Sequence, residues 1–342
     1  MKQSTGIISS APTLTDAEEL EDASIEVEWR NLSVSAEQHG ERLDKALVEA
    51  APEFSRSYLQ QLIEAERVTI NTQVARKASI KVKAGDVLVI ELRPTPQSQA
   101  FTPQAMPLDV VFEDAHILVI NKPAGLVVHP APGNWSGTLL NGLLAYAPTI
   151  AAVPRAGIVH RLDKDTSGLM VVARSRAVMD ALVHSIAARD VSRQYLAIAH
   201  RPWTGPARRT VDAPIGRDPR NRLRMAVIDL ESQAGKTAKT DVVFLDNADI
   251  GCLVRCILHT GRTHQIRVHM ASLGHPLVAD VVYGGVCVAG MPRQALHATR
   301  LAFAHPVTGQ ALAFEVPPPE DFSALLSAWG LRYNPTARVE NP

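Results

Sequence analysis

Several features that often reveal the class of a protein are scarce or missing in this chain of 342 residues. Its three cysteines, Cys252, Cys256 and Cys287, are too few for a disulfide framework and fit a reducing compartment. No apolar run approaches the roughly 18 residues of a membrane span. The polar first residues lack the apolar core of a secretory signal. We therefore expect the chain in the cytoplasm, with no membrane partner.

Patterns for nucleotides and metals are missing as well. The sequence holds neither GxGxxG nor a Walker loop. Cys252 and Cys256 lack the second cysteine pair of a zinc site, so we interpret them as residues of an apolar strand. His259, His264 and His269 follow one another at five-residue intervals. Neighbours at that spacing point about 140° apart on a helix, so we expect no metal site there.

The formal net charge is zero, but the charges are unevenly distributed. Residues 1–32 hold seven carboxylates against two basic side chains, which leaves 33 basic and 28 acidic side chains in 33–342. An acidic segment that is almost without aromatic residues buries too little to offset chain entropy. We therefore predict that 1–32 is disordered. The mildly basic remainder permits a polyanionic partner.

Periodicity in the remainder predicts two folded units. Apolar residues at helical spacing in 43–47 and 59–63, with β-rich runs at 68–71 and 87–90, predict a small module. Four prolines and no periodicity mark 93–108. Many strands and few helices then predict a mixed, mainly antiparallel α+β domain. The expected parts are a disordered acidic extension at 1–32, the module at 33–95, a linker at 96–108, the larger domain at 109–330 and a tail at 331–342.

The densest polar segment is GIVHRLDKDTSG at 157–168, which runs into the apolar residues LMVV at 169–172. A polar loop that enters a buried strand is a common place for catalytic groups. A turn closed by Asp and Ser caps has the same composition. From the residues alone, a catalytic loop and a structural turn are equally good interpretations.

Several segments resemble, in order, the motifs of the RluA-type RNA pseudouridine synthases. HRLDKDTSG at 160–168 resembles the family signature, and GERLDKAL at 40–47 resembles the S4-type RNA-binding module that precedes the synthase domain in many members. The other matching segments are NKPAGLVVHP at 121–130, RQYLA at 193–197, TGRTHQIRVHMASLGHP at 260–276 and RQALHATRLAFAHPVTG at 293–309. The likeness is strongest to members that modify 23S ribosomal RNA. It implies an S4-like module at 33–95 and a pseudouridine synthase catalytic domain at 109–330.

The resemblance also implies roles for individual residues. Asp163 corresponds to the essential catalytic carboxylate of the family, whereas we assign Asp165 to loop structure. Arg267 corresponds to the arginine that pairs with the catalytic aspartate, and Tyr195 to the tyrosine that packs on the target base. Arg161 corresponds to the arginine that helps to fill the gap left by a flipped nucleotide.

The implied reaction breaks the N1–C1′ bond of a uridine, turns the uracil and rejoins it through C5. Because this isomerisation is redox-neutral, the resemblance implies no redox cofactor, nucleotide or metal. An ionised Asp163 would attack C1′, attack the base or remove a proton. A paired arginine favours the ionised form of a carboxylate.

The implied partner is ribosomal RNA, as 23S rRNA or a pre-50S particle, and we expect a monomer. One alternative is the same chemistry at another rRNA site or on tRNA. A second alternative is a non-enzymatic RNA-binding assembly factor, against which the set of candidate catalytic residues argues. Candidate RNA-binding residues are Arg42, Arg56, Arg67, His160, Arg161, Arg220 and Arg222. A solvated basic face would also explain Arg220 and Arg222.

One turn departs from the family pattern. Relatives commonly carry Gly-Asp-Pro after the family's third motif, which here is the segment 260–276, whereas this chain has Ala279-Asp280-Val281. Because Tyr283-Gly284-Gly285 follows, we expect the turn to persist.

Overall fold

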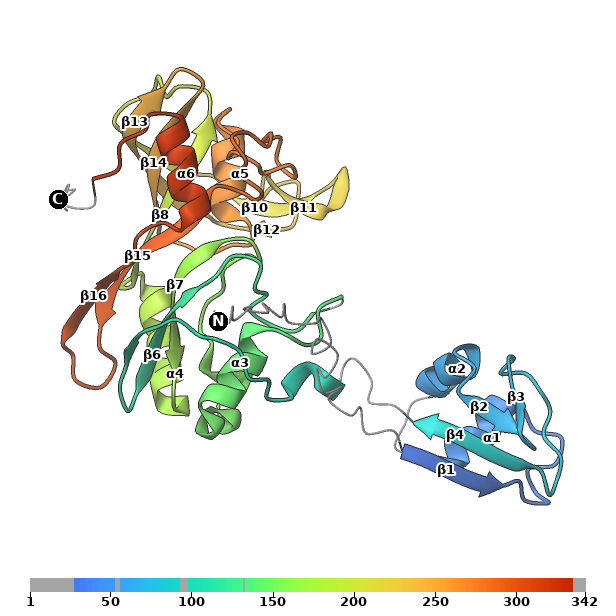
Figure 1. The fold of residues 1–342 in the computed structure, drawn as a ribbon. Helices are drawn as coiled ribbons and strands as arrows, with labels where there is room; N and C mark the ends of the chain where they lie inside the picture. Colours follow the sequence, from blue (N-terminus) through green and yellow to red (C-terminus); the bar gives the residue numbers. More distant parts are fainter. Residues whose placement is uncertain (1–27, 53–55, 93–97, 132, 335–342) are drawn as a thin grey trace, which may run out of the picture. The chain divides into compact units, whose positions relative to one another are not determined.

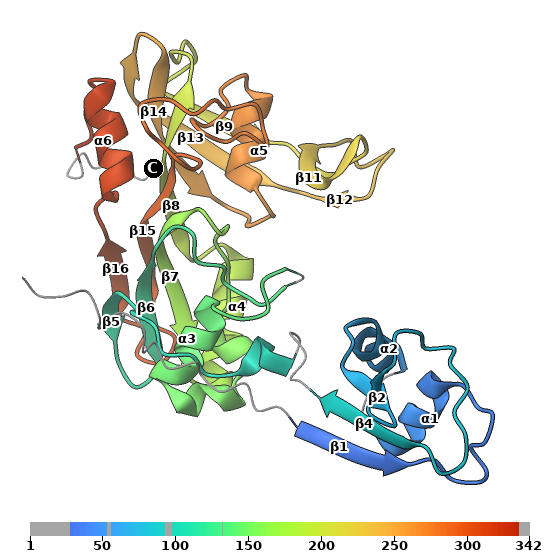
Figure 2. The same ribbon diagram turned by 45° about the vertical axis from the view of Figure 1, so that its right-hand side comes forward.

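The computed structural model describes residues 28–52, 56–92, 98–131 and 133–334, and the chain divides into two units between Gln99 and Ala100 (Figures 1 and 2). Each unit has its own sheet and its own apolar core. The α+β class predicted from the sequence is confirmed. In the described residues, no helix is both long and apolar enough to cross a bilayer.

The first unit is a four-stranded antiparallel sheet with two helices. Its strand order is β1-β4-β2-β3. The elements are β1 (Glu28–Ser33), α1 (Leu43–Ala50), α2 (Arg56–Glu64), β2 (Val68–Ile70), β3 (Gln73–Val74) and β4 (Val87–Leu92). Leu43 and Leu47 of α1 and Leu59 and Ile63 of α2 are fully buried. The apolar residues whose spacing predicted the two helices therefore form their packed faces.

The first strand begins earlier than the composition suggested. Residues 28–32 belong to β1, where the sequence had predicted disorder up to residue 32 and a module from residue 33. The strand pairs along its whole length with β4, from Glu28 opposite Leu92 to Ser33 opposite Val87. The backbone pairing compensates for the scarcity of apolar residues in β1. Residues 1–27 of the predicted extension lie outside the described part of the chain.

The second unit is built on a nine-stranded sheet with the order β5-β6-β7-β15-β8-β14-β13-β9, and β16 pairs with β15. The pair β7–β15 is parallel, and the other pairs described in this sheet are antiparallel. The strands are β5 (Val110–Glu113), β6 (Ile117–Lys122), β7 (Ser167–Ala173), β8 (Ser192–His200), β9 (Arg208–Asp212), β13 (Lys239–Ala248), β14 (Gly251–Leu258), β15 (Leu296–Ala304) and β16 (Ala311–Glu315). The predicted mainly antiparallel sheet is confirmed.

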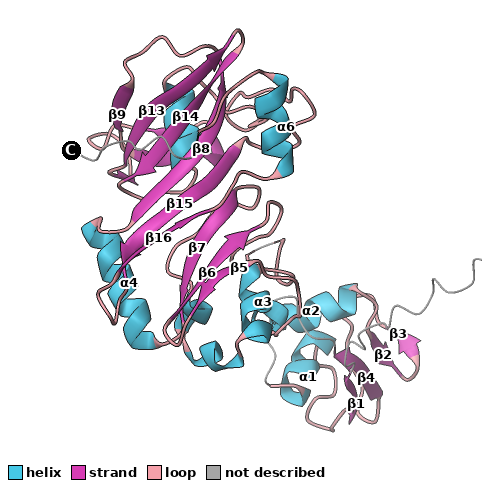
Figure 3. Ribbon diagram, turned by 60° about the vertical axis from the view of Figure 1, so that its left-hand side comes forward, coloured by secondary structure: helices cyan, strands magenta, loops and turns pink. Residues whose placement is uncertain are grey.

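Helices cover both faces of this sheet (Figure 3). Alternate residues of β7 divide between two cores, with Met170 and Val172 in the core of α3 and Leu169 and Val171 in that of α4. The helices are α3 (Leu139–Tyr146), α4 (Arg176–Ala188), α5 (Gln265–Ser272) and α6 (Glu320–Ala328), with 3₁₀ turns η1 (Ser98–Phe101), η2 (Pro148–Ala152) and η3 (Pro154–Gly157). β7 is therefore a central strand that is buried on both sides.

Smaller features complete the second unit. A three-stranded sheet has the order β11-β10-β12, formed by β10 (Ile215–Asp218), β11 (Asn221–Val227) and β12 (Gly235–Lys236). Cys252 and Cys256 are buried in β14, as predicted.

The ends of the second unit also differ from the predicted boundaries. Within the predicted linker, Asn141 of α3 donates its side-chain amide to the carbonyl oxygen of Thr102, at 2.9 Å. At the other end, Leu331 of the predicted tail is buried against α6. Both ends of the second unit are therefore packed further than composition alone indicated.

Candidate active site

Asp163 lies in the loop that leads from η3 into β7. The loop turns tightly, since the backbone N–H of Thr166 donates to the carbonyl oxygen of Asp163 at 3.1 Å. The strand then starts against β15, where a Cβ on Gly168 would lie 2.2 Å from the carbonyl oxygen of Ala298. Gly168 also has a φ of +115°, which favours glycine. The glycine of the signature therefore allows the loop to join a closely packed parallel strand pair.

Two buried cations hold the backbone that follows Asp163. The ammonium group of Lys122, at the end of β6, donates to three carbonyl oxygens at 2.7–2.9 Å, and one of them belongs to Lys164. Burial lowers the pKa of Lys122 to about 7. Arg293 donates to the carbonyl oxygen of Asp165 at 2.9 Å and forms an ion pair with Asp321 of α6. The backbone carbonyl groups of the two residues after Asp163 are therefore both held by buried side chains.

The carboxylate of Asp163 is bound by a buried arginine that a second carboxylate holds. Nη1 of Arg267, on α5, lies 3.1 Å from Oδ2 of Asp163. The Nε and Nη2 atoms of Arg267 donate to the two carboxylate oxygens of Asp280 at 2.7 and 2.8 Å. The exposed fractions are 7% for Arg267, 1% for Asp280 and 17% for Asp163. Asp163 is therefore the open end of a three-member ion network.

The charges in this network stabilise one another. Burial would lower the pKa of Arg267, but the hydrogen bonds and charges of Asp280 and Asp163 raise it well above its usual range. The turn that carries Asp280 persists despite the departure from Gly-Asp-Pro, as expected, because the backbone N–H groups of Tyr283 and Gly285 donate to the carbonyl oxygen of Asp280. Ala279 adopts the left-handed φ of 60° in this turn.

His264 and Tyr283 pack beside the same network. Nδ1 of His264 lies 2.8 Å from the hydroxyl of Tyr283, and its Nε2 lies 3.9 Å from Oδ1 of Asp163. Burial lowers the pKa of His264, while the charge of Asp163 opposes that shift. The guanidinium carbon of Arg267 lies 5.0 Å from the centre of the Tyr283 ring, within cation–π distance. Tyr283 therefore contacts Arg267 through its ring and His264 through its hydroxyl.

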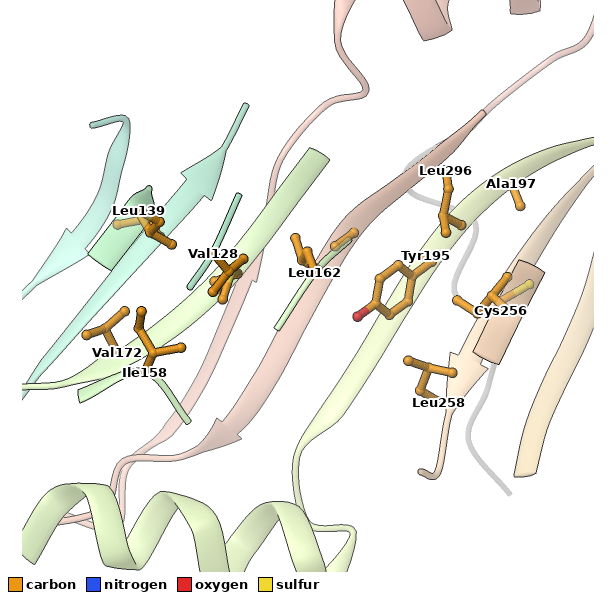
Figure 4. Close-up of a cluster of buried hydrophobic side chains, with 14 of the residues drawn as sticks. Val128, Leu139, Ile158, Leu162, Val172, Tyr195, Ala197, Cys256, Leu258 and Leu296 are labelled. Atoms are coloured by element: carbon orange, nitrogen blue, oxygen red, sulfur yellow. The ribbon is translucent and has the colours of Figure 1, made fainter. Parts of the chain in front are cut away.

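Tyr195, on β8, presents an aromatic surface near the carboxylate. Its ring packs in the core cluster with Leu162, Leu258 and Leu296 (Figure 4). Burial raises the pKa of Tyr195 to about 12, and the neighbouring Asp163 acts in the same direction. The phenol is therefore neutral at ordinary pH, and the side chain offers a ring face and a hydroxyl.

Asp163 and Tyr195 line one cavity of about 930 Å³ in the second unit. Its only carboxylate, among the described residues, is Asp163. The arginines that line it are Arg155, Arg161, Arg189, Arg193, Arg262 and Arg267. A cavity with this balance of charge attracts an anionic ligand and brings it to one carboxylate.

The other two candidates in the signature have different surroundings. Arg161 is exposed and lines the cavity, as a residue that meets RNA should. Nε2 of His160 instead accepts the backbone N–H of Val171 at 3.1 Å. Burial lowers the pKa of His160 to about 3, so the imidazole is neutral. His160 therefore connects the loop to β7 through this hydrogen bond, and it also borders the cavity.

Two candidate RNA-binding arginines of the first unit share a carboxylate that the sequence analysis had not singled out. The side chain of Asp44 is fully buried, and it forms ion pairs with Arg42 at 3.0 Å and with Arg56 at 2.9 Å. Gln60 donates to the same carboxylate at 2.6 Å. The hydrogen bond from Arg42 holds the pKa of Asp44 well below its usual range. The two cations stay half-exposed, so they form a fixed basic patch.

The remaining candidates lie in different elements. Arg67 pairs with Glu91 of β4 at 3.0 Å. Arg220 is exposed in the turn between β10 and β11. Arg222 lies in β11, and its side chain is outside the described part of the structure.

His259, His264 and His269 have separate partners. His259 pairs with Asp241 at 2.9 Å, and Nδ1 of His269 lies 2.9 Å from the hydroxyl of Thr240. Among the described residues, no group of three or more His, Cys, Asp or Glu side chains could hold a metal ion.

The sequence did not identify the residues that support Asp163 and Arg267. These residues act through tertiary contacts, and no local spacing relates them to Asp163. They are Lys122, His264, Asp280, Tyr283 and Arg293. Only the motifs around them could have pointed to the site.

Comparison with known proteins gives two family matches. Residues 116–272 match the RNA pseudouridylate synthase family, and residues 41–88 match S4 domains. The chain is similar over most of its length to curated proteins named ribosomal large subunit pseudouridine synthase D. The protein of Neisseria meningitidis serogroup B is 45% identical over 323 residues, 91% of this chain and 84% of that protein. The protein of Nitrosomonas europaea is 46% identical, over 89% of this chain and 88% of that protein.

The Escherichia coli K12 protein of the same name is 45% identical, over 86% of this chain and 92% of that protein. Among solved structures, human RNA pseudouridylate synthase domain containing 4 is 24% identical with a TM-score of 0.53, over 66% of this chain and 94% of that chain. That likeness supports the fold.

Proposed function

The chain belongs to the RNA pseudouridylate synthase family, and we propose that it converts specific uridines of large-subunit (23S) ribosomal RNA to pseudouridine. The names of the relatives support this substrate. The charge balance of the cavity supports a polyanionic ligand. We further propose that the enzyme works as a monomer in the cytoplasm, on free rRNA or on a pre-50S particle.

The observation that carries the proposal is the placement of Asp163. Its carboxylate opens to the cavity, is bound at 3.1 Å by a buried arginine, and shares the cavity with Tyr195. In the reaction, the N1–C1′ bond breaks, the uracil turns, and C5 bonds to C1′. N1 ends with a proton and C5 loses one, so atoms and electrons balance. Asp163, the carboxylate among the described residues that line the cavity, would act on the sugar or the base.

The surrounding residues would prepare the nucleotide for this step. A uridine must leave its stack to enter the cavity, which costs a few kcal/mol. The ring of Tyr195 would stack on the flipped base, and Arg161, which is exposed and lines the same cavity, would occupy the vacated space. Burial of the ion network keeps water from the cleaved sugar, which water would otherwise capture.

The S4-like unit would supply affinity and choice of site. Its Arg42 and Arg56 are held at fixed positions by Asp44, which suits contact with phosphates. The catalytic candidates all lie in the second unit. Through the proline-rich segment 93–108, the unit would raise the local concentration of RNA at the cavity.

Release of tritium from RNA labelled at C5 of uridine tests the function, because the isomerisation expels the C5 proton. We expect release from 23S rRNA transcripts and pre-50S particles, and none from 16S rRNA or tRNA. Release from tRNA alone would overturn the substrate, and release from none of them would favour the alternative of a non-enzymatic assembly factor. Asp163→Asn serves as the inactive control.

A further inference from the structure

Arg193, at the start of β8, is a buried cation of the cavity, and no ion pair is found for it in the part of the chain that the structure describes. Its exposed fraction is 5%, and it lines the same cavity as Asp163. Its Nε is sealed from solvent and has no hydrogen-bond partner among the described residues. The described ion pairs likewise include none for Arg193. The cavity wall therefore holds a largely buried positive charge for which the described residues supply no counter-charge.

The guanidinium group has a definite place in the cavity wall. A Cβ on Gly261 would lie 2.9 Å from Nη1 of Arg193, so the two are in close contact. The charge of Arg193 adds to the lowering of the pKa of His160 and opposes the rise of the pKa of Tyr195. Arg193 therefore lies near both side chains. The glycine between β14 and α5 thus leaves space for the arginine beside the base-stacking ring.

Other buried arginines of the second unit differ from Arg193 in their partners or in their position. Arg267 and Arg293 are buried to a similar degree, and each forms an ion pair, with Asp280 and Asp321 respectively. Arg255 shares an unpartnered Nε, but it does not line the cavity. An uncompensated buried charge strongly destabilises a fold. Arg193 therefore combines an energetic penalty in the free protein with a position where a ligand can remove it.

We propose that Arg193 binds a phosphate group of the RNA backbone next to the flipped uridine. This inference rests on the proposed function. A phosphate is favoured over a uracil carbonyl because a charged acceptor gains more from a desolvated guanidinium than a neutral one does. The planar fork of arginine also matches two oxygens of one phosphate. Each nucleotide that enters the cavity brings such a group with it.

The proposal predicts opposite effects on the free and the bound protein. Arg193→Gln removes a buried unpaired charge, so the full-length free protein should keep or raise its Tm. The same change should weaken binding of a 23S rRNA transcript roughly 10-fold, the loss of one charged hydrogen-bonded contact. It should also lower the slope of log K against log salt by about 0.7–0.9, as expected for one phosphate contact. Binding is measured in the Asp163→Asn background, so that the RNA stays unmodified.

Two matched variants separate the explanations. Arg193→Lys keeps the charge and should restore the salt slope while recovering only part of the affinity. Arg174→Gln changes the net charge equally, at a residue paired with Glu113 outside the cavity, and should leave the slope unchanged. An unchanged slope in Arg193→Gln, or a fall in Tm that Arg193→Lys reverses, would overturn the proposal. Tritium release by the wild-type chain on the same RNA is measured first, so a failure of the proposed function is recognised separately.

Discussion

The two units use the same pair of side chains in opposite arrangements. In the S4-like unit, one buried carboxylate, Asp44, holds two arginines that are 48% and 53% exposed. In the synthase unit, one buried arginine, Arg267, holds two carboxylates, of which only Asp163 reaches the cavity. The first arrangement presents positive charge to the surroundings, and the second presents negative charge.

The difference shows how a buried partner decides the function of the exposed one. A cation fixed at the surface suits a phosphate backbone, which it meets without ordering a long side chain. A carboxylate fixed in the wall of a cavity suits a reaction at a sugar or a base. We therefore expect damage to the Asp44 assembly to weaken binding and damage to the Arg267 assembly to slow the chemistry.

The largest expected effect comes from removing the presented carboxylate. Asp163→Asn keeps the shape but loses the ionisable oxygen, and should lower single-turnover tritium release at least about 10³-fold. RNA binding should survive. Asp165→Asn, two residues away in the same loop, should be much milder, because Arg293 binds the backbone carbonyl of Asp165. If Asp165→Asn proved the more damaging of the two, the assignment within the loop would be wrong.

The next largest effect comes from the inner carboxylate. Asp280→Asn leaves Arg267 without its bidentate partner and should slow the saturated rate by roughly 10–100-fold through misplacement of the arginine. Because the pair is buried, we also expect a loss of about 3 kcal/mol in the free energy of unfolding, measured in urea. Asp180→Asn breaks an exposed Arg–Asp pair on α4 and should change neither quantity. A normal rate in folded Asp280→Asn would contradict a positioning role.

A smaller effect is expected in the S4-like unit. Asp44→Asn should free Arg42 and Arg56 and weaken binding to 23S rRNA roughly 10-fold, without changing the rate at saturating enzyme. Filter binding measures the affinity, and circular dichroism checks the fold. Glu66→Gln, which breaks an exposed pair with Arg76 in the same unit, is the matched control. Unchanged affinity in Asp44→Asn would mean that the fixed patch does not meet RNA.

Mild acid should weaken the support of the Asp163 loop by His160 and leave the Asp44 assembly intact. The pKa of His160 falls from 6.5 to about 3 on folding, so the unfolded chain takes up the proton first. Stability is therefore lost as the pH falls from about 6.5, by up to about 1.4 kcal/mol per pH unit. The pKa of Asp44 is also lowered, but a lowered carboxylate loses its contribution only below its ordinary value of 3.8. Between pH 6.5 and 5, the His160 contribution should change, whereas that of Asp44 should not.

Urea unfolding of wild type and His160→Gln at several pH values measures this contribution. His129 and His297 also have pKa values lowered to about 4, and they affect both proteins equally. The wild type should lose more stability than the variant over this range. Parallel curves would remove His160 as the anchor between the loop and β7.

Local patterns predicted much of the fold. Helical spacing identified α1 and α2. The polar segment before an apolar run marked the loop of Asp163, but it fitted a structural turn as well as a catalytic loop until the resemblance favoured the latter. The resemblance suggested the pairing of Asp163 with Arg267, and the structure brings the two to 3.1 Å. These features depend on neighbours in the sequence or on motifs with fixed spacing.

Partners that depend on tertiary packing were not predictable in this way. Asp280 and Asp44 lie near their arginines in the sequence, but only the fold shows that their carboxylates are buried. His160 was expected to contact RNA, whereas the fold turns its Nε2 to a backbone N–H. Strand β1 also escaped detection, because pairing with β4 rather than its own composition holds it.

Titration of RNA in single-turnover tritium release tests the division of work most directly, with Asp280→Asn and Asp44→Asn compared in one assay. Asp280→Asn should lower the rate at saturating enzyme and leave the half-saturating concentration nearly unchanged. Asp44→Asn should raise the half-saturating concentration roughly 10-fold and leave the saturated rate unchanged. The opposite pattern, or both variants shifting both quantities alike, would contradict the account.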